Sequence, residues 1–336
     1  MRLHSVDSTS PDPDVIADAA ARLRIGELVA FPTETVYGLG ANALDPAAVA
    51  RIFAAKGRPS YNPVIVHVAD VDAARRVVTQ WPESAATLAA AFWPGPLTIV
   101  LPKSAEVPDI VSAGLPLIGV RVPAHPVALA LLRAARIPVA APSANKSNQL
   151  SPTSAEHVMR GLADVEGVVL DGGPCEVGIE STVVDLSTER PTLLRPGGVS
   201  VAALEAVLGV TLQRRAPDVA SDAPRRSPGS LSRHYAPRAR TCTVAAGDAV
   251  ALATTIDSLR HDGATIGVMI YSDFGLPFRE DVVVRVMPSR AESYAHQLFA
   301  TMHALDAAGV SAIVVEAVPG SATWDAVRDR LRRAIA

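Results

Sequence analysis

Cysteine is scarce in this sequence of 336 residues, and the two that occur, Cys175 and Cys242, lie far apart. They match neither a metal-ligand spacing nor a disulfide framework, so a cysteine-based zinc site is excluded and a reducing compartment such as the cytoplasm is expected. The N-terminal residues are polar and include no apolar core of a signal peptide. No apolar run reaches the roughly eighteen residues that a membrane span needs, which predicts a soluble protein.

Neither sign of charge dominates, because 31 basic residues are balanced by 34 acidic ones and the net charge is −3. A pI of about 6.2 argues against a protein whose main role is to grip a nucleic-acid backbone. Aromatic residues make up only 4% of the chain, so cores built from Ala, Val, Leu and Ile are expected within the 49% apolar content. One domain of this length would be unusually large, so two are expected.

Strand-like and helix-like segments alternate through the first 210 residues. A helix over 13–25 ends at Gly26, and a second begins at Asp45-Pro46, a good cap followed by a proline that suits the first turn. We expect strands near 28–31, 62–68, 97–102, 117–123, 137–142, 167–171, 182–185 and 192–195, with helices over 70–92 (interrupted at 81–82), after Ser151 and over 200–208.

Apolar periodicity disappears over 213–240, where Arg, Pro, Ser and Asp dominate, so this segment is predicted to be a linker. From 241 onward strands and helices alternate again, with a helix over 291–308 that places Tyr294, Leu298, Met302 and Leu305 on one face. That alternation predicts a small parallel α/β domain. It has no Gly-x-Gly-x-x-Gly loop and no evident acid/base group.

The stretch Phe31–Gly40 carries the first signs of a binding site. Thr33, Glu34 and Thr35 follow an apolar strand directly, and Gly38 and Gly40 are expected to turn the chain. Strand ends that open into glycine-containing loops are where α/β proteins bind ligands. Lys56 and Arg58 follow the next helix and suit a phosphate or carboxylate, although cations at a helix C-terminus are also often solvated.

Several later strands carry single polar residues. His67 lies in an apolar run and can equally be a satisfied core residue. Arg121 also lies in an apolar strand, where it requires either an ion pair or a ligand. Ser143-Ala-Asn145 follows another strand and offers neutral hydrogen bonds, or simply a turn. Ser151-Pro is expected to cap the next helix, a position that can also bind an anion.

Lys56-Gly-Arg58-Pro together with Ser143-Ala-Asn145 resembles the Lys-x-Arg…Ser-x-Asn signature of the YrdC-like threonylcarbamoyl-AMP synthases. The stretch Phe31–Gly40 and the run from Asn62 to His67 match as well, and the resemblance extends from about residue 12 to the C-terminus. It implies the long form of the family, which is α/β throughout. The expected parts are a YrdC-like catalytic domain with a twisted mixed sheet (12–210), a linker that closes over the nucleotide (211–240) and a smaller Rossmann-like parallel domain (241–336).

The resemblance implies an enzyme, a nucleotidyltransferase, that condenses L-threonine, bicarbonate and ATP to threonylcarbamoyl-AMP and pyrophosphate. Mg²⁺ is expected on the nucleotide phosphates, with no protein metal site and no tightly bound organic cofactor. The product would serve N6-threonylcarbamoyladenosine formation in tRNA, through partner proteins that carry out the transfer. No membrane partner is expected.

The resemblance also implies roles for individual residues. Lys56 and Arg58 are the expected catalytic cations, and Arg121 is expected to hold the threonine carboxylate. The other threonine-binding residues are Thr35, His67, Ala141 and Ser181. The expected ATP-binding residues are Arg58, Asn62, Leu117, Ser143, Asn145, Ser151, Arg195, His234 and Tyr235.

Alternatives to these interpretations remain open from the sequence. The chain could be a module that binds structured RNA without catalysis, or a carbamoyl-transfer enzyme related to hydrogenase maturation proteins. The second would be expected to carry accessory zinc-finger segments, for which this chain has no cysteine cluster. The Pro228-Gly229 turn and the His234-Tyr235 pair favour a lid over a featureless tether, which is the other interpretation of the linker.

Overall fold

The computed structural model describes residues 1–214, 235–260, 264–275 and 277–335. These residues group into two compact units. The first contains the described residues up to Ser147 and from Ser151 to 214, and the second contains Asn148–Leu150 and the described residues from 235 on. Residues 235–240, which the sequence assigns to the linker, therefore group with the second unit.

The first two helices of the first unit begin where the sequence predicts. Helix α1 (Pro13–Arg24) is capped by Asp12, and α2 (Pro46–Lys56) is capped by Asp45, whose carboxylate accepts two backbone N–H groups. Gly57 ends α2 at φ +60°, the left-handed conformation that glycine adopts without strain. The remaining helices are α3 (Val71–Arg76), α4 (Glu83–Phe92), α5 (Asp109–Ser112), α6 (Pro126–Ala135), α7 (Ala155–Gly161) and α8 (Val201–Leu208).

The strands of the first unit form one mixed sheet in the order β1-β8-β2-β3-β7-β4-β6-β5-β9-β10-β11. Strand β2 is antiparallel to β3, whereas β4 is parallel to β6. The sheet confirms the predicted mixed α/β class. Its strands are β1 (Arg2–Ser5), β2 (Val29–Phe31), β3 (Gly38–Asn42), β4 (Val66–His67), β5 (Leu97–Pro102), β6 (Leu117–Arg121), β7 (Val139–Ala140), β8 (Val168–Asp171), β9 (Thr182–Asp185), β10 (Thr192–Arg195) and β11 (Gln213–Arg214).

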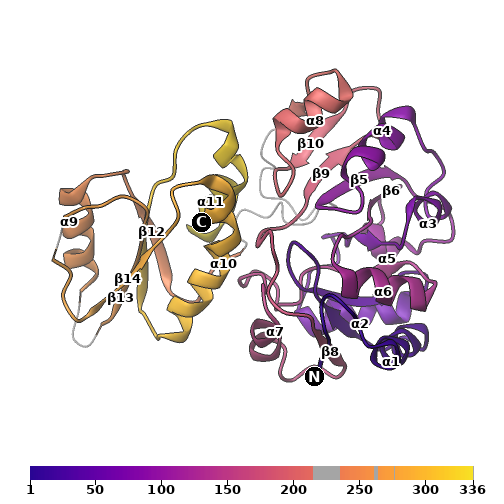
Figure 1. The fold of residues 1–336 in the computed structure, drawn as a ribbon, viewed down its shortest axis with the longest axis horizontal. Helices are drawn as coiled ribbons and strands as arrows, with labels where there is room; N and C mark the ends of the chain where they lie inside the picture. The colour runs from indigo at the N-terminus through magenta and orange to yellow at the C-terminus, as the bar shows by residue number, and fades with distance from the viewer. Residues whose placement is uncertain (215–234, 261–263, 276, 336) are drawn as a thin grey trace. The chain divides into compact units, whose positions relative to one another are not determined.

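Both faces of this sheet are buried along its inner strands, which explains why β2 and β8 are mostly apolar, whereas the edge strands β1 and β11 are mostly exposed. Along β2, Val29 and Phe31 join a core with α1 and α6, while Ala30 between them joins the core on the opposite face. Helices α1 and α6 lie side by side (Figure 1). The opposite core contains Ile52 of α2 and Leu88 of α4. The buried sheet thus fixes the position of every strand end described below.

The expectation that Gly38 and Gly40 turn the chain is wrong, because both lie in strand β3. The bend occurs earlier, at residues 34–36. A Cβ at Gly40 would lie 2.8 Å from the Phe31 ring and 2.9 Å from the Val139 side chain. Glycine is therefore required at this position by close packing rather than by backbone conformation. Strand β1 was not predicted; its residues are mostly exposed and lack apolar alternation.

The predicted cap at Ser151 is also wrong. Helix α7 begins only at Ala155, and the side chain of Ser154 accepts the N–H of His157 as its cap. Ser151 instead donates its hydroxyl to Glu180, as described below. The strands expected over 62–68 and 137–142 are shorter than predicted, because only β4 (Val66–His67) and β7 (Val139–Ala140) have ladder partners there.

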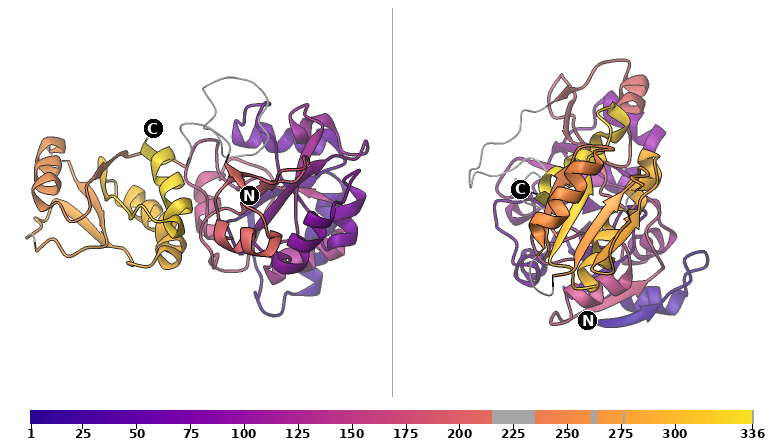
Figure 2. Two further views of the ribbon diagram at one scale, coloured as in Figure 1. Left: turned by 90° about the horizontal axis from the view of Figure 1, so that it is seen from above. Right: turned by 90° about the vertical axis from the view of Figure 1, so that its left-hand side faces the viewer.

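The second unit is a parallel sheet in the order β12-β15-β13-β14, as the alternation of its sequence predicts. Helix α9 lies on one face of this sheet and α10 with α11 on the other (Figures 1 and 2). All four residues of the predicted apolar face of α10 are buried. The elements are β12 (Arg240–Val244), α9 (Ala249–Leu259), β13 (Ile266–Ile270), β14 (Val282–Val286), α10 (Ala291–Ala307), β15 (Ala312–Glu316), the 3₁₀ turn Ala322–Trp324 and α11 (Asp325–Ile335).

A buried carboxylate occupies the carboxyl ends of the strands in this second sheet. Glu316, the last residue of β15, accepts the backbone N–H groups of Gly247, Tyr271 and Ser272 at 3.1, 2.7 and 2.9 Å. Strand ends of this kind are the usual ligand site of parallel α/β sheets. Here the protein's own side chain binds the donors that a ligand phosphate would use.

Among the described helices of both units, none is long and apolar enough to cross a lipid bilayer.

Candidate active site

The Phe31–Gly40 stretch and the Ser143–Asn145 loop lie side by side in the first unit. The N–H of Leu39 donates to the carbonyl of Pro142 at 2.8 Å, and the N–H of Ala144 donates to the carbonyl of Tyr37 at 2.8 Å. An isolated bridge pairs Gly38 with Ser143. Two of the motifs that carry the family resemblance are therefore joined by main-chain hydrogen bonds.

Lys56 links the third motif to these two. Its ammonium donates to the carbonyl oxygens of Ser143, at 2.6 Å, and Asn145, and its side chain is only 2% exposed. The alternative of a solvated cation at the end of α2 is therefore wrong. Burial lowers the pKa of Lys56 well below its usual value, and the nearby charges of Arg58 and Lys146 lower it further. An anion bound beside Lys56 would favour its charged form.

Arg58 is buried as well, and its guanidinium donates to the carbonyl oxygens of Asn62 at 2.9 Å and Pro63 at 2.6 Å. The side chain of Asn62 is fully buried, yet neither atom of its amide has a hydrogen-bond partner among the described residues. An unsatisfied buried amide is costly and is usually explained by a missing ligand or water. Asn62 therefore offers one donor and one acceptor to a ligand.

Arg121 has contacts through all three nitrogens of its guanidinium. Its Nε donates to the carbonyl of Gly95 at 3.1 Å, and one terminal nitrogen donates to the hydroxyl of Thr35 at 2.9 Å. The other terminal nitrogen lies 2.7 Å from Oε1 of Glu34. Such fixation holds a guanidinium in place before any carboxylate binds. The ion pair that the sequence left open as an alternative is thus present, with Glu34 as its partner.

His67 lies opposite Arg121 in the parallel pairing of β4 with β6. Burial, and then the charge of Arg121, lower the pKa of His67 to about 3, so its imidazole is neutral at pH 7. Its Nδ1 has no hydrogen-bond partner among the described residues, and its ring meets Phe31 edge-on at 6.2 Å. A neutral imidazole beside a guanidinium can donate a hydrogen bond to a small polar ligand, or accept one from it, without adding charge to the site.

Ser181 and Arg195 form a second hydrogen-bonded group. The Ser181 hydroxyl lies 2.8 Å from that of Thr98, and Arg195 donates to the Ser181 hydroxyl and carbonyl at 3.1 and 2.9 Å. All three side chains are buried. Thr98 was not predicted from the sequence. It comes beside Ser181 only because β5 pairs in parallel with β9, with Leu97 opposite Thr182.

Ser151 donates to the carboxylate of Glu180 at 2.5 Å, and both are buried. Glu180 is a buried polar residue that the sequence analysis did not single out, whereas Thr33 and Glu34 were noted with the Phe31–Gly40 stretch but given no individual role. Ala141 is buried next to β7, where its N–H donates to the carbonyl of Ile65 at 2.9 Å. Leu117, the first residue of β6, is half-buried.

Two expected ATP-binding residues come from the linker. His234 lies outside the described residues. Tyr235 is buried in the second unit, where its ring lies 5.6 Å from that of Phe299 and the guanidinium of Arg330 lies 5.2 Å from its centre. Tyr235 therefore packs inside the second unit, which the sequence analysis did not predict. The contact of both residues with ATP stays a prediction.

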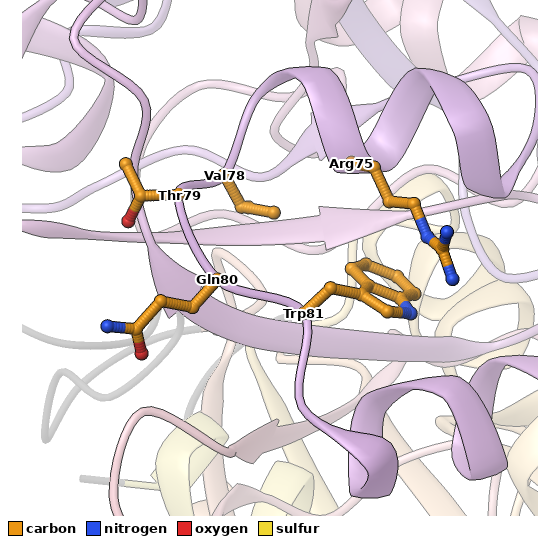
Figure 3. A pocket seen from close by; sticks show the side chains of 5 residues that line it. All are labelled: Arg75, Val78, Thr79, Gln80 and Trp81. Carbon is orange, nitrogen blue, oxygen red and sulfur yellow. The ribbon is translucent and has the colours of Figure 1, made fainter.

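A small pocket of about 240 Å³ is lined by Arg75, Val78, Thr79, Gln80 and Trp81 (Figure 3). The Arg75 guanidinium lies 5.6 Å from the centre of the Trp81 ring. None of these residues belongs to the groups described above. Among the described residues, no cluster of three His, Cys, Asp or Glu side chains could hold a metal ion.

Family comparisons cover almost the whole chain. Residues 21–197 match the Sua5/YciO/YrdC family, described as "Telomere recombination", and residues 199–336 match a family described as "Threonylcarbamoyl-AMP synthase, C-terminal domain". A threonylcarbamoyl-AMP synthase of Pyrococcus abyssi is 43% identical over 320 residues, which are 94% of this chain and 92% of the relative. A threonylcarbamoyl-AMP synthase of Bacillus subtilis is 40% identical over 330 residues, with 98% and 95% covered.

A solved structure has the same fold over its full length. The crystal structure of P. abyssi Sua5 complexed with L-threonine aligns with a TM-score of 0.92 at 40% identity, covering 100% of this chain and 98% of that chain. Fold and site together define a two-unit α/β protein whose first sheet carries buried cations and neutral hydrogen-bonding groups at its strand ends. The chain belongs to the Sua5/YrdC family.

Proposed function

We propose that this chain is an L-threonylcarbamoyladenylate synthase, a nucleotidyltransferase that condenses L-threonine, bicarbonate and ATP to threonylcarbamoyl-AMP and pyrophosphate. Relatives at 40–43% identity over nearly the full length carry the name threonylcarbamoyl-AMP synthase. The observation that carries the proposal is the group of buried cations in one unit of a net-acidic protein. These are Lys56, Arg58, Arg121 and Arg195, each at most 8% exposed.

The reaction needs such a group because its substrates are anions. Bicarbonate, the triphosphate of ATP and the threonine carboxylate repel one another in water, and preorganised cations remove that cost. Lys56 and Arg58 are proposed to contact the centre formed by bicarbonate and the α-phosphate. The charge of Lys56, disfavoured by burial, would be stabilised by these anions.

The threonine pocket is proposed to consist of Thr35, His67, Arg121, Ala141 and Ser181. Arg121 is proposed to bind the carboxylate, since a guanidinium already fixed by Gly95 and Thr35 loses little freedom on binding. His67 and Ser181 would supply neutral hydrogen bonds to the remaining polar groups. A relative crystallised with L-threonine supports an amino acid as the ligand.

ATP is proposed to bind Arg58, Asn62, Leu117, Ser143, Asn145, Ser151 and Arg195, with His234 and Tyr235 from the linker. The unpartnered amide of Asn62 is the structural feature that most calls for a polar ligand in this group. Mg²⁺ is proposed to reach the site on the nucleotide, held by phosphate and water oxygens, which matches the chemistry of this hard cation.

The product would form in two steps, carbamate formation and attack on ATP. The threonine ammonium first loses a proton to solvent. The amine nitrogen then takes up the carboxyl group of bicarbonate and releases water, and an oxygen of the resulting carbamate attacks the α-phosphorus and displaces pyrophosphate. The chain's residues contribute by positioning and by compensating charge, because no Ser-His-Asp or Cys-His arrangement occurs among the described residues that the site brings together. The product would pass to cytoplasmic proteins that transfer the threonylcarbamoyl group to tRNA.

Pyrophosphate release measured with ATP, threonine and bicarbonate, each omitted in turn, tests the proposal. We expect release only when all three are present. Release that does not depend on threonine would contradict the assignment. An RNA-binding module would instead release no pyrophosphate but bind tRNA with an affinity that falls steeply as salt rises.

A further inference from the structure

Glu34 is held in the site by two segments far from it in the sequence. Its Oε2 accepts the N–H of Ala124 at 3.1 Å, and its main-chain carbonyl accepts the N–H of Val177 at 2.7 Å. The side chain is 6% exposed. Its neighbours in sequence, Thr33 and Thr35, share a hydrogen bond of 2.7 Å between their hydroxyls. Glu34 is therefore a fixed, buried carboxylate at the end of β2.

The second carboxylate oxygen of Glu34 forms an ion pair but has no hydrogen-bond partner among the described residues. Oε1 lies 2.7 Å from Nη2 of Arg121, yet the two are not aligned as a hydrogen bond, and neither has another hydrogen-bond partner among the described residues. The other guanidinium nitrogens already donate to Gly95 and Thr35. A cationic donor of Arg121 and an anionic acceptor of Glu34 thus lie side by side, both buried and neither with a hydrogen-bond partner among the described residues.

That combination matches the charges of a free α-amino acid. Such a molecule carries an ammonium and a carboxylate on one carbon, so its two charges fall on neighbouring groups. Burying either charge without a partner is expensive, and a site for the zwitterion must supply one group of each sign. Glu34 and Arg121 form an ion pair with each other, so neither charge is uncompensated before the ligand binds.

We propose that Glu34 and Arg121 bind the two charged ends of the substrate amino acid, with Oε1 of Glu34 accepting from the ammonium and Nη2 of Arg121 donating to the carboxylate. This inference rests on the proposed function and adds to it the group that recognises the amino end. The four charges then alternate in sign around the ligand. Selection for a free α-amino acid over a hydroxy acid follows from the Glu34 carboxylate.

Isothermal titration calorimetry on the full chain provides the test, with wild type, Glu34→Gln and a matched control, Glu27→Gln. Glutamine retains an oxygen for the N–H of Ala124 but not the negative charge. Glu27 also pairs with an arginine, Arg22 at 2.9 Å, but at the half-buried end of α1. The ligands are L-threonine, 3-hydroxybutanoate, which lacks the ammonium, and threoninol, which lacks the carboxylate.

We expect wild type and Glu27→Gln to bind threonine and neither analogue measurably. Glu34→Gln should bind threonine about tenfold more weakly or worse, the scale of a lost hydrogen bond to a charged group, while its KM for ATP stays within about twofold. Unchanged threonine affinity in Glu34→Gln overturns the inference, as does a wild type that binds 3-hydroxybutanoate as tightly as threonine.

If Glu34→Gln does not fold, which its melting curve will show, Glu34→Asp takes its place. It keeps the charge but shortens the side chain by one methylene, so it should also weaken threonine binding, and unchanged affinity there overturns the inference. The two levels of proposal also fail differently. A wild type that does not bind threonine at all contradicts the proposed function. A wild type that binds threonine without regard to the ammonium contradicts only the role of Glu34.

Discussion

His67 and Arg121 lie opposite each other on neighbouring parallel strands, at the last residues of β4 and β6. Both side chains are buried, and the guanidinium is the nearest charge that lowers the pKa of the imidazole after burial itself. The pair therefore contains one permanent charge and one neutral ring. Together the two side chains can bind a carboxylate and an uncharged polar group of the same ligand.

The first prediction concerns the stability of the first unit in acid. Folding lowers the pKa of His67 from 6.5 to about 3. The contribution of the neutral imidazole to the free energy of unfolding is therefore fully present above pH 6.5 and is lost as the pH falls toward 3. Between pH 7 and pH 4.5 this loss amounts to about 2–3 kcal/mol of the free energy of unfolding. Urea unfolding of wild type and His67→Asn at both pH values should show a smaller loss in the variant. Equal losses would mean that His67 does not titrate in this way.

The second prediction concerns the cations after α2. Lys56→Ala and Arg58→Ala should each lower turnover by about 10²-fold or more, the scale of a lost electrostatic stabiliser. Lys103→Ala is the matched control, because Lys103 also donates to a backbone carbonyl, that of Val107 at 2.8 Å, but takes no part in the proposed site. Steady-state pyrophosphate release is the measurement. Wild-type rates in both folded variants would remove the two residues from the mechanism.

The third prediction concerns the choice of amino acid. Nδ1 of His67, a residue of the proposed pocket, is buried without a hydrogen-bond partner among the described residues, so a ligand that cannot hydrogen-bond would leave it unpaired. A site built to pair a substrate hydroxyl rejects the analogue lacking it by a large factor. L-valine, which resembles threonine in shape, should therefore be a very poor substrate. The kcat/KM for the two amino acids, measured at saturating ATP, checks this, and comparable values would contradict the pocket.

The fourth prediction concerns Tyr235. Its ring is buried against Phe299 and under the guanidinium of Arg330, so Tyr235→Ala should destabilise the second unit by about 3–5 kcal/mol. The melting of the first unit should stay unchanged, and ATP use should weaken if Tyr235 also contacts the nucleotide. Tyr235→Phe is the control, because it retains the ring. Calorimetric melting that shows no change in the second unit would contradict the packing role.

The fifth prediction concerns the segment 213–240, of which residues 215–234 lie outside the described part of the chain. Its sequence predicts a lid over bound ATP, which would exclude water from a reactive mixed anhydride. ATP together with threonine should then slow proteolysis within this segment. Cleavage at the same rate with and without ligands would support a tether instead.

Local signals in the sequence were sufficient for most helices and for the class of fold. Asp45-Pro46 starts α2 because a carboxylate cap and a proline act within a single turn. The apolar face of α10 followed from its spacing alone. The four-stranded parallel sheet followed from alternation of short segments, and the family resemblance followed from Lys56, Arg58, Ser143 and Asn145 in their order.

Only the tertiary structure decided which polar groups meet. Glu34 and Arg121 are 87 positions apart, and Thr98 and Ser181 are 83 apart, so no local pattern reports their contact. Gly40 looked like a turn but lies in a strand, because the constraint on it is the Phe31 ring across the β2–β3 pair. Ser151 looked like a cap but bonds Glu180. Helix caps and periodicity depend on neighbours within one turn, whereas strand register and buried pairs depend on how distant segments pack, which only the folded chain fixes.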